Sequence, residues 1–419
     1  MKKYDLIVVG GGLSGVCASI AAARTGLNVL LIEKSGTLGG AMSNSLVYPF
    51  MPYWTRDKET NEKKYLSGGI FKDMLNIQAA LCSNTSDTNF SPEYFKFVLD
   101  KMIQDSGADV LFHAVVYDVV KNDRCIKSVK VIAGSEKLDF EADYFIDTTG
   151  DGNLFYMAGC DYMLGRKSDN LCQPMTTCFR ISGVDTELFN AENGNIQKLY
   201  KEYQYAGEIS NPRENILTFT GIGQGIVHFN TTRIIKLDPT NPFDVSKAEI
   251  IARKQILELV NFLKKVSPAF KNSTLISIAS DIGIRESRKL RGEHILTEEE
   301  LKNCTKFYDG IALGNYDIDI HNPSGSGTSH YYFKAGEYYS IPYRSLLPKE
   351  FDNLLVAGRC ISATHEAQAS IRIMPICACM GEAAGLAMAV AKKTNTNTHT
   401  LNTELLIKEL KESGAIVEL

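Results

Sequence analysis

The chain has 419 residues, of which 44% are hydrophobic and 22% are charged, so it is long enough for two domains with buried cores. Its formal net charge of -4 gives no electrostatic basis for a nucleic-acid partner. No uninterrupted apolar stretch approaches the roughly 20 residues that a membrane span requires, and Asp5 and the glycines after it interrupt any signal-peptide pattern, so the sequence predicts a soluble cytoplasmic protein.

Ten cysteines are scattered along the chain, several of them inside apolar runs where cysteine acts as a small hydrophobic residue. One residue separates Cys377 from Cys379, whereas a zinc knuckle or a redox pair has two. We therefore expect reduced thiols and no metal site, with a single redox-active cysteine as the alternative.

The first forty residues have the pattern of one nucleotide-binding unit. Residues 6–9 form a β-branched apolar run typical of a buried parallel strand. A G-x-G-x-x-G motif begins at Gly10, and its glycines permit a tight turn, close approach of a pyrophosphate to the backbone, and close packing of helix on strand. The helix expected over 16–24 begins at the phosphate, where its unpaired N–H groups and the Ser14 hydroxyl would face the anion.

A second apolar strand is predicted over 28–32, and Glu33 follows it. A carboxylate at this position can accept both ribose hydroxyls of an adenosine and repels a 2′-phosphate, which favours FAD or NAD over NADP. The pair Gly39-Gly40 comes six residues later. The segment EKSGTLGG resembles the FAD-binding half of the glutathione reductase and fumarate reductase class of flavoproteins, in which a second glycine pair lies along the pyrophosphate.

Residues 41–89 leave the nucleotide-binding pattern. This excursion is either a lid over the active site or an ordered surface insertion with no role in turnover. After it, Ser91 and Pro92 predict the start of a helix that Gly107 ends.

Three short strands rich in valine and isoleucine are then predicted over 110–120, 126–132 and 137–140, as an antiparallel meander. A further strand over 144–147 returns to the nucleotide-binding sheet and ends in DTTGDG at 147–152. This segment resembles the second fingerprint of the same flavoprotein class, in which the chain crosses the dinucleotide again, and the resemblance favours FAD over NAD.

The cofactor is expected to be noncovalent FAD, because no histidine, cysteine or tyrosine immediately follows Gly40 where the tethering residues of relatives occur. The residues expected to bind it are Gly10, Gly12, Leu13, Ser14, Gly15, Glu33, Lys34, Gly39, Gly40, Ala41, Val115, Thr149, Gly150, Asp151, Gly358, Arg359 and Ile373.

A second domain is predicted over 159–343, with strands at 176–181, 216–220, 225–230 and 274–279 and one amphipathic helix around 256–263. Its segment DIGIRESRKLRG places Arg285, Arg288 and Arg291 three residues apart, on what would be one helical face. These arginines are either an anion-binding edge of the active site, held by Glu286, or a solvated basic face. The polar segment 315–339 contains His321 and His330, which in such a loop are more often simply exposed.

The last strand is predicted over 353–358, and a charge-poor helix with Pro375 near its start follows and ends near Ala391. Because 359–375 connects these two elements, we expect its side chains to face the isoalloxazine. His365 would transfer a proton, and Arg372 would bind a substrate carboxylate or neutralise the reduced flavin. The alternative is that His365 only caps the loop and Arg372 forms a structural ion pair.

Over nearly all 419 positions the chain resembles the bacterial FAD-dependent oxidoreductase family of the glutathione reductase type, through GGGLSG, EKSGTLGG, DTTGDG, GIRESRKLRG, IPYRSLLPKEFDNLLVAGR and HEAQASIRIMP. The resemblance implies an α/β fold, with a Rossmann-like FAD-binding domain that carries a β-meander (1–158 and 344–395), an inserted α+β substrate or cap domain (159–343) and a helical tail (396–419).

The predicted activity is hydride transfer between the flavin and a small polar substrate, carboxylate-bearing or hydroxylated. The alternatives are a flavin-dependent lyase or isomerase without net redox, and a non-enzymatic nucleotide-binding protein. The predicted catalytic residues are His365, Arg372, Arg285 and Arg288. The sequence leaves the substrate, the electron donor or acceptor and the oligomeric state open.

Overall fold

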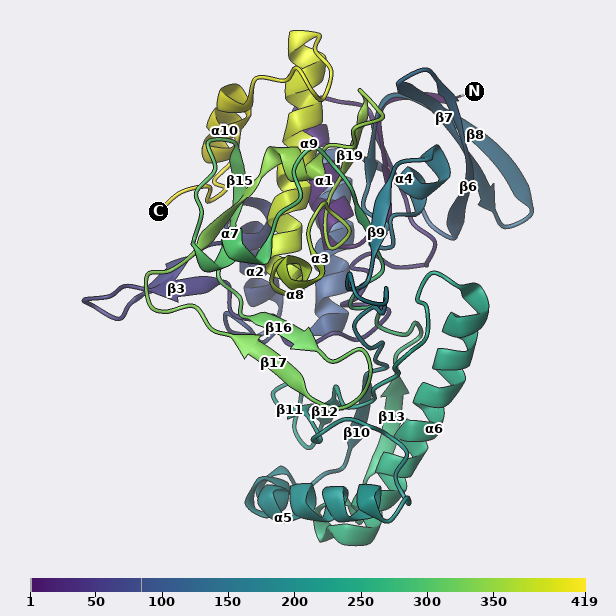
Figure 1. Ribbon diagram of the computed structural model, residues 1–419, viewed down its shortest axis with the longest axis vertical. Coiled ribbons are helices and arrows are strands. Elements are labelled where there is room, and N and C mark those ends of the chain that lie inside the picture. The colour runs from purple at the N-terminus through teal and green to yellow at the C-terminus, as the bar shows by residue number, and fades with distance from the viewer. Residues whose placement is uncertain (1, 84) are drawn as a thin grey trace.

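The computed structural model describes residues 2–83 and 85–419 (Figure 1). The helices are α1 (Leu13–Arg24), α2 (Gly69–Leu81), α3 (Pro92–Ser106), α4 (Asn153–Ala158), α5 (Thr186–Tyr205), α6 (Pro242–Val266), α7 (Glu298–Lys302), α8 (His365–Ile371), α9 (Met374–Thr394) and α10 (Thr403–Glu412). The strands are β1 (Lys2–Val9), β2 (Val29–Ile32), β3 (Trp54–Arg56), β4 (Lys63–Tyr65), β5 (Asp109–Leu111), β6 (Ala114–Asn122), β7 (Cys125–Ala133), β8 (Glu136–Asp147), β9 (Tyr162–Leu164), β10 (Phe179–Ser182), β11 (Thr218–Phe219), β12 (Val227–Phe229), β13 (Thr274–Ile278), β14 (Arg288–Leu290), β15 (Gly310–Gly314), β16 (Ile318–His321), β17 (Thr328–Tyr331), β18 (Tyr339–Pro342) and β19 (Leu354–Val356).

The main sheet has the strand order β5-β2-β1-β8-β7-β6, with β19 paired to β8. Strand β1 lies parallel to both β2 and β8, and β19 lies parallel to the end of β8. The apolar runs of these strands are fully buried, as expected for parallel strands covered on both faces. The predicted α/β class with a Rossmann-like sheet is therefore confirmed.

Two predicted strand boundaries are wrong. The strands predicted over 137–140 and 144–147 are one continuous strand, β8, whose first half pairs antiparallel with β7 and whose second half pairs parallel with β1. The strand predicted over 110–120 is two strands, since β5 joins the edge of the parallel sheet beside β2 and β6 begins the meander. The break falls at His113, whose backbone φ of 51° lies in the left-handed region and interrupts the extended conformation of a strand.

Helices α1 and α9 pack directly against each other beside this sheet (Figure 1). Two glycines of α9 make the contact close, because a Cβ on Gly381 would overlap the backbone oxygen of Ser14 and a Cβ on Gly385 that of Ala18. Within the described part of the chain, α9 is the one helix long and apolar enough to cross a membrane, but 94% of its apolar stretch is buried inside the protein. Its composition is thus that of a core helix.

The excursion 41–89 divides into two parts. Its second half forms α2, which packs against α3 and α9 and so belongs to the core around the main sheet. The small hairpin of β3 and β4 projects from the molecule at the left of Figure 1. Helix α10 in turn packs on α9.

A second lobe contains the antiparallel sheet β11-β12-β10-β13. One face of this sheet is covered by α5 and α6, which enclose a core around Phe179, Phe229 and Phe270 (Figure 1). The chain enters this lobe after β8 and returns to the main sheet at β19.

Candidate flavin-binding and substrate site

A cavity of about 380 Å³ opens where four strands of the main sheet end. Gly10 follows β1, Glu33 follows β2, Thr148 follows β8 and Ala357 follows β19, so the lining comes from the carboxyl ends of parallel strands, where such sheets bind ligands. Of the predicted cofactor-binding residues, the cavity is lined by Gly10, Gly12, Leu13, Ser14, Glu33, Lys34, Gly39, Gly40, Ala41, Thr149, Gly150, Asp151, Gly358 and Arg359. Val115 lines an adjoining smaller cavity, whereas Gly15 and Ile373 line neither.

The first glycine motif has the geometry that a pyrophosphate needs. A Cβ on Gly10 would lie 2.6 Å from the carbonyl oxygen of Thr148, and one on Gly15 would overlap the carbonyl oxygen of Gly10. A Cβ on Gly12, in contrast, would meet no atom within 4 Å, because this residue faces the open cavity. The first and third glycines therefore allow close packing, and the second leaves room for the ligand.

The second glycine pair lies directly on the first motif. The Gly39 N–H donates to the Gly11 carbonyl oxygen at 2.8 Å, and a Cβ on Gly40 would lie 2.9 Å from the Gly12 Cα. Both residues have positive φ, which only glycine adopts without strain. The two glycine-rich loops thus form one continuous wall of the cavity.

Glu33 is buried, and both of its carboxylate oxygens are held by the loops. One oxygen accepts the Gly11 N–H at 2.5 Å, and the other accepts the Ser35 N–H at 2.8 Å and the Ser35 hydroxyl at 2.7 Å. A carboxylate fixed in this way, at the end of β2 and facing the cavity, is in position to accept ribose hydroxyls.

Arg359 supplies a positive charge to the same cavity. Its Nη2 donates to Asp151 Oδ1 at 2.6 Å and its Nη1 to the Ser287 hydroxyl at 2.9 Å. Burial alone would lower the pKa of Arg359, but the charge of Asp151 outweighs burial and the pKa is raised. The guanidinium is therefore a fixed cation beside the second fingerprint.

The start of α9 reaches the cavity through Met374 and Cys377. The Ser14 hydroxyl donates to the Cys377 carbonyl oxygen at 2.8 Å, so it joins the first turns of α1 and α9. All ten cysteines are free thiols, and burial raises the pKa of Cys377 and of Cys379 to about 12. Neither thiol is ionised at neutral pH, which argues against thiolate chemistry here.

One predicted substrate residue, Arg372, lines this cavity, with Nη2 3.4 Å from Asp319 Oδ2. Arg285 does not line it, although the neighbouring Ile284 does. Burial and, to a smaller extent, the charge of Arg372 lower the pKa of Arg285 to about 9. The two guanidiniums therefore lie close enough for their charges to interact.

The partners of Arg285 are all neutral. Its Nη1 donates to the Pro174 carbonyl oxygen at 2.7 Å and to the Thr176 hydroxyl, and its Nη2 to Asn230 Oδ1 at 3.3 Å. The predicted partner, Glu286, instead binds Lys289 and His365. Arg285 thus carries a charge that no carboxylate pairs with directly.

The predicted helical face of three arginines is wrong. Residues 288–290 form β14, which pairs with β9, so the arginines diverge. Arg288 lies over the Tyr156 ring, with its guanidinium carbon 4.1 Å from the centroid, and Arg291 pairs with Asp161. The three arginines of this segment therefore do not form one face.

The structure also places the predicted catalytic histidine elsewhere. His365 begins α8, and its Nδ1 lies 2.7 Å from the buried carboxylate of Glu286. The imidazole lines a second cavity of about 430 Å³, together with Arg166, Ser326 and Thr328, and does not line the flavin cavity. Helix α8, about two turns long, lies between His365 and Arg372, and the two side chains line different cavities. The argument that all of 359–375 faces the flavin therefore fails for His365.

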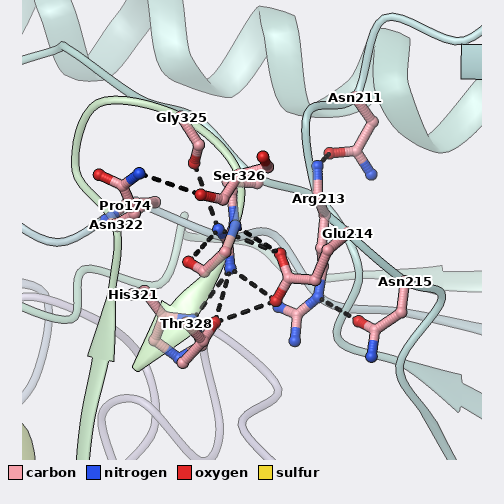
Figure 2. Close-up of polar contacts among 12 residues, drawn as sticks. Pro174, Asn211, Arg213, Glu214, Asn215, His321, Asn322, Gly325, Ser326 and Thr328 are labelled. Atoms are coloured by element: carbon pink, nitrogen blue, oxygen red, sulfur yellow. Dashed lines mark hydrogen bonds and ion pairs between the residues drawn. The ribbon is translucent and has the colours of Figure 1, made fainter. Parts of the chain in front are cut away.

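A network that the sequence did not indicate supports Arg372. Figure 2 shows Glu214, His321 and Thr328 converging on one point, which is the guanidinium of Arg233. The Arg233 Nη2 lies 3.1 Å from His321 Nδ1, and a guanidinium can only donate, so Nδ1 accepts and Nε2 carries the proton. Burial lowers the pKa of His321 to about 3, so the imidazole is neutral.

The neutral His321 directs its Nε2 at Asp319 Oδ2, 3.3 Å away. Burial alone would raise the pKa of Asp319, but the bond from His321 and the charges of Arg372 and Arg285 lower it. Asp319 is therefore an anion fixed between His321 and Arg372. The only sequence signal for this network was the polar composition of 315–339.

A comparison with known families identifies the class of protein. The model described as FAD dependent oxidoreductase matches residues 5–412. The chain therefore belongs to this family; it is an FAD-dependent oxidoreductase, and FAD is its cofactor.

Individual curated relatives match smaller parts of this chain than the family model does. Digeranylgeranylglycerophospholipid reductase of Picrophilus torridus is 26% identical over 198 residues, which cover 44% of this chain and 48% of the relative. The mitochondrial dihydrolipoyl dehydrogenase of Schizosaccharomyces pombe is 50% identical over 155 residues, 35% of this chain and 28% of that protein. The chain thus spans about half or less of these curated relatives. A geranylgeranyl bacteriochlorophyll reductase-like structure from Thermoplasma acidophilum aligns with 98% of this chain and 83% of its own, at 15% identity and a TM-score of 0.48.

Proposed function

We propose that this enzyme transfers hydride between noncovalently bound FAD and a small organic substrate that carries a carboxylate, and that Arg285 and Arg372 hold this carboxylate. The observation that carries the proposal is the charge of Arg285, which lies within the protein beside Arg372 and has only neutral hydrogen-bond acceptors. Arg285 is intermediate in exposure as a whole residue. A partly buried cation without a carboxylate partner is costly, and an anionic substrate would supply that partner.

FAD supplies the hydride-transfer chemistry when it is bound, and the protein positions the reactants. Arg285 and Arg372 would orient the carboxylate, and a guanidinium fork favours that geometry. Asp319 holds Arg372 through Nη2, so the direction of this arginine is set before substrate arrives. The first turn of α9 places its positive dipole end at the cavity, where it would stabilise negative charge on the reduced cofactor.

The finer assignment to the glutathione reductase and fumarate reductase class is part of this proposal. Three loops support it: the G-x-G-x-x-G turn, the Gly39-Gly40 turn packed on it, and the turn after β8 that carries Asp151. Ten free cysteines support a reducing compartment such as the cytoplasm.

The test is anaerobic reduction of the flavin by a panel of small 2-hydroxy acids and sugar acids, each compared with its methyl ester. We expect flavin bleaching with at least one acid and much slower bleaching with its ester. In Arg285→Met and Arg372→Met, FAD should stay bound while bleaching slows about 30- to 100-fold, the loss of one charge-assisted bond.

His365→Asn is the control variant, since the imidazole lines the other cavity and should leave bleaching within about threefold of wild type. Equal rates for acid and ester, or wild-type rates in both arginine variants, would rule out a carboxylate held by these two residues.

A further inference from the structure

Three polar side chains lie together on one face of the second lobe's sheet, where Tyr48 of the 41–89 excursion packs against it; we call Tyr48, Arg180 and His228 the Arg180 cluster. Arg180 on β10 and His228 on β12 are directly paired in the sheet. They lie on the face opposite Phe179 and Phe229, which stack toward α5 and α6. Tyr48 crosses this opposite face, with its ring centroid 5.6 Å from that of His228.

Among the described residues, five polar atoms of this cluster have no hydrogen-bond partner. Arg180, His228 and Tyr48 are 7%, 0% and 1% exposed. Arg180 Nε and Nη2, both ring nitrogens of His228 and the Tyr48 hydroxyl are shut off from solvent and make no hydrogen bond among the described residues. Five of the thirteen such atoms in the described chain thus gather at one place. Each unsatisfied group costs about 1 to 3 kcal/mol, so five of them at one place call for a ligand or water that supplies the missing bonds.

The charge of Arg180 is also poorly compensated. The nearest carboxylate recorded, Glu93 Oε1 on the exposed start of α3, lies 3.9 Å from Nη1, beyond hydrogen-bond length. The other oxygen of Glu93 binds Lys96 at 2.7 Å. The Nε and Nη2 edge of the guanidinium, two parallel N–H donors, therefore remains free, and this edge is the one that binds a carboxylate through two bonds.

The neighbours of that edge supply further donors and no negative charge. Burial and, to a smaller extent, the charge of Arg180 lower the pKa of His228 to about 3, so the imidazole is neutral and offers one N–H. The Tyr48 hydroxyl offers one O–H. A water molecule could satisfy some of these donors but would leave the positive charge unpaired.

We propose that the Arg180 cluster binds a small monovalent anion of carboxylate type, at a site separate from the flavin cavity. The guanidinium edge of Arg180 would hold it, and the N–H of His228 and the hydroxyl of Tyr48 would complete the site. None of these three residues lines the flavin cavity.

The cluster and Arg285 lie along the same two segments. Thr176, whose hydroxyl accepts from Arg285, precedes Arg180 by four residues, and Asn230, whose Oδ1 accepts from Arg285, follows His228 by two. A small apolar cluster of Leu46, Cys178 and Ala279 lies on this sheet face. The backbone of Leu46 has a φ of 53°, a strained conformation that the folded protein maintains beside the cluster.

The test is the thermal unfolding midpoint of the FAD-loaded protein, titrated with sodium formate in a chloride-free buffer. We expect a saturable rise in wild type that persists in Arg372→Met, because this variant loses only formate binding at the flavin cavity. In the Arg372→Met background, Tyr48→Phe keeps the ring and loses one donor, so it should need about tenfold more formate. Arg180→Met in the same background should abolish the saturable response.

A second measurement does not depend on Arg180→Met folding. In wild-type protein with ¹⁵N-labelled arginine, the Nε–H resonance of Arg180 should shift with formate along the same saturation curve, and Tyr48→Phe should move that curve. The proposal is overturned if all variants gain stability equally, if the Arg180 resonance does not respond, or if Arg372→Met alone abolishes the response, which would assign the binding to the flavin-side arginines.

Discussion

At the scale of single residues, the Glu33 carboxylate both holds the loops around the cavity and lines the cavity itself. Its oxygens accept three bonds from Gly11 and Ser35, which fixes the turns on either side of the cavity. The same carboxylate lines the cavity where an adenosine ribose would lie. Replacing its charge therefore weakens both the preformed wall and the contacts to the cofactor.

We expect Glu33→Gln to lower FAD affinity by about 2 to 3 kcal/mol, or roughly 30- to 150-fold, because charge-assisted bonds are lost and the amide places a donor opposite the donors of Ser35. The measurement is titration of apoprotein with FAD by flavin fluorescence. Glu62→Gln, on the exposed hairpin between β3 and β4, is the control and should bind like wild type. Affinity within twofold of wild type in Glu33→Gln would contradict this role.

Residue-level predictions can be made where one short segment determines the geometry. Gly10, Gly12 and Glu33 line the cavity because a strand, a turn and a helix in sequence leave them no other place. Asp319 and Arg233 were missed because their roles depend on elements that meet only in the fold. Spacing alone placed Arg288 beside Arg285, and the strand β14 separates them.

At the scale of elements, the contact between α1 and α9 positions both helix starts at the cavity. The residues that permit it are Gly381 and Gly385. The hydrogen bond from Ser14 to the Cys377 carbonyl oxygen then fixes the two first turns relative to each other. We therefore expect a substitution that disrupts the packing of α1 on α9 to weaken FAD binding as well.

Gly381→Ala should lower the free energy of unfolding by about 2 kcal/mol or more and weaken FAD binding, because the new methyl group overlaps the Ser14 backbone oxygen. Gly194→Ala is a matched control, since Gly194 lies inside α5 with nothing within 4 Å of its Cβ position. That variant should gain about 0.5 to 1 kcal/mol from helix propensity. Chemical denaturation with flavin fluorescence measures both, and equal effects in the two variants would contradict the packing argument.

Glu382, also on α9, links this helix to α2 and to the C-terminal segment. Its carboxylate accepts the Ile70 N–H at 3.0 Å and the Ser413 hydroxyl at 2.8 Å. Burial raises the pKa of Glu382 to about 7. The folded state therefore holds this proton more tightly than the unfolded chain does, and the free energy of unfolding falls as pH rises from about 4.5 to about 7.

Glu382→Gln should remove this pH dependence, because the amide stays neutral and keeps an acceptor for Ile70. We expect the variant to resemble wild type near pH 5 and to exceed it at pH 8 by up to about 3 kcal/mol, at about 1.36 kcal/mol per pKa unit. Urea denaturation at the two pH values measures the difference. A variant less stable than wild type at pH 8 would show that the ionised carboxylate is the stabilising form.

Element-level predictions identified most strands and helices but misjudged two junctions. β8 continues through the point where a break was predicted, because its first half and its second half pair with different neighbours of one sheet. Sequence reading separates strands by composition, and only the pairing reveals that one strand serves two partners. The helix predicted from Ser91 and Pro92 to Gly107 was confirmed, since its start and end signals are local.

At the scale of the whole molecule, the flavin cavity connects segments from the entire chain. Its lining includes Gly10 near the start, Asp151 after β8, Ile282 from the return of the second lobe and Cys377 near the end. The order of these segments was predictable because each carries a motif. The inserted lobe was predictable only as a location in the chain, since its arginines acquire their neighbours through folding.

Because the cofactor joins these segments, FAD should stabilise the whole fold, and it should do so without a covalent bond. The one cysteine lining the cavity, Cys377, has a pKa raised to about 12 by burial, so it lacks the thiolate that a covalent link would need. We expect the holoprotein to exceed the apoprotein in free energy of unfolding by about 2.7 kcal/mol at a free FAD concentration near 100 times Kd. Denaturation at several FAD concentrations tests this dependence, and acid precipitation should release all the yellow colour into the supernatant. Colour retained in the pellet, or stability independent of FAD concentration, would contradict noncovalent binding.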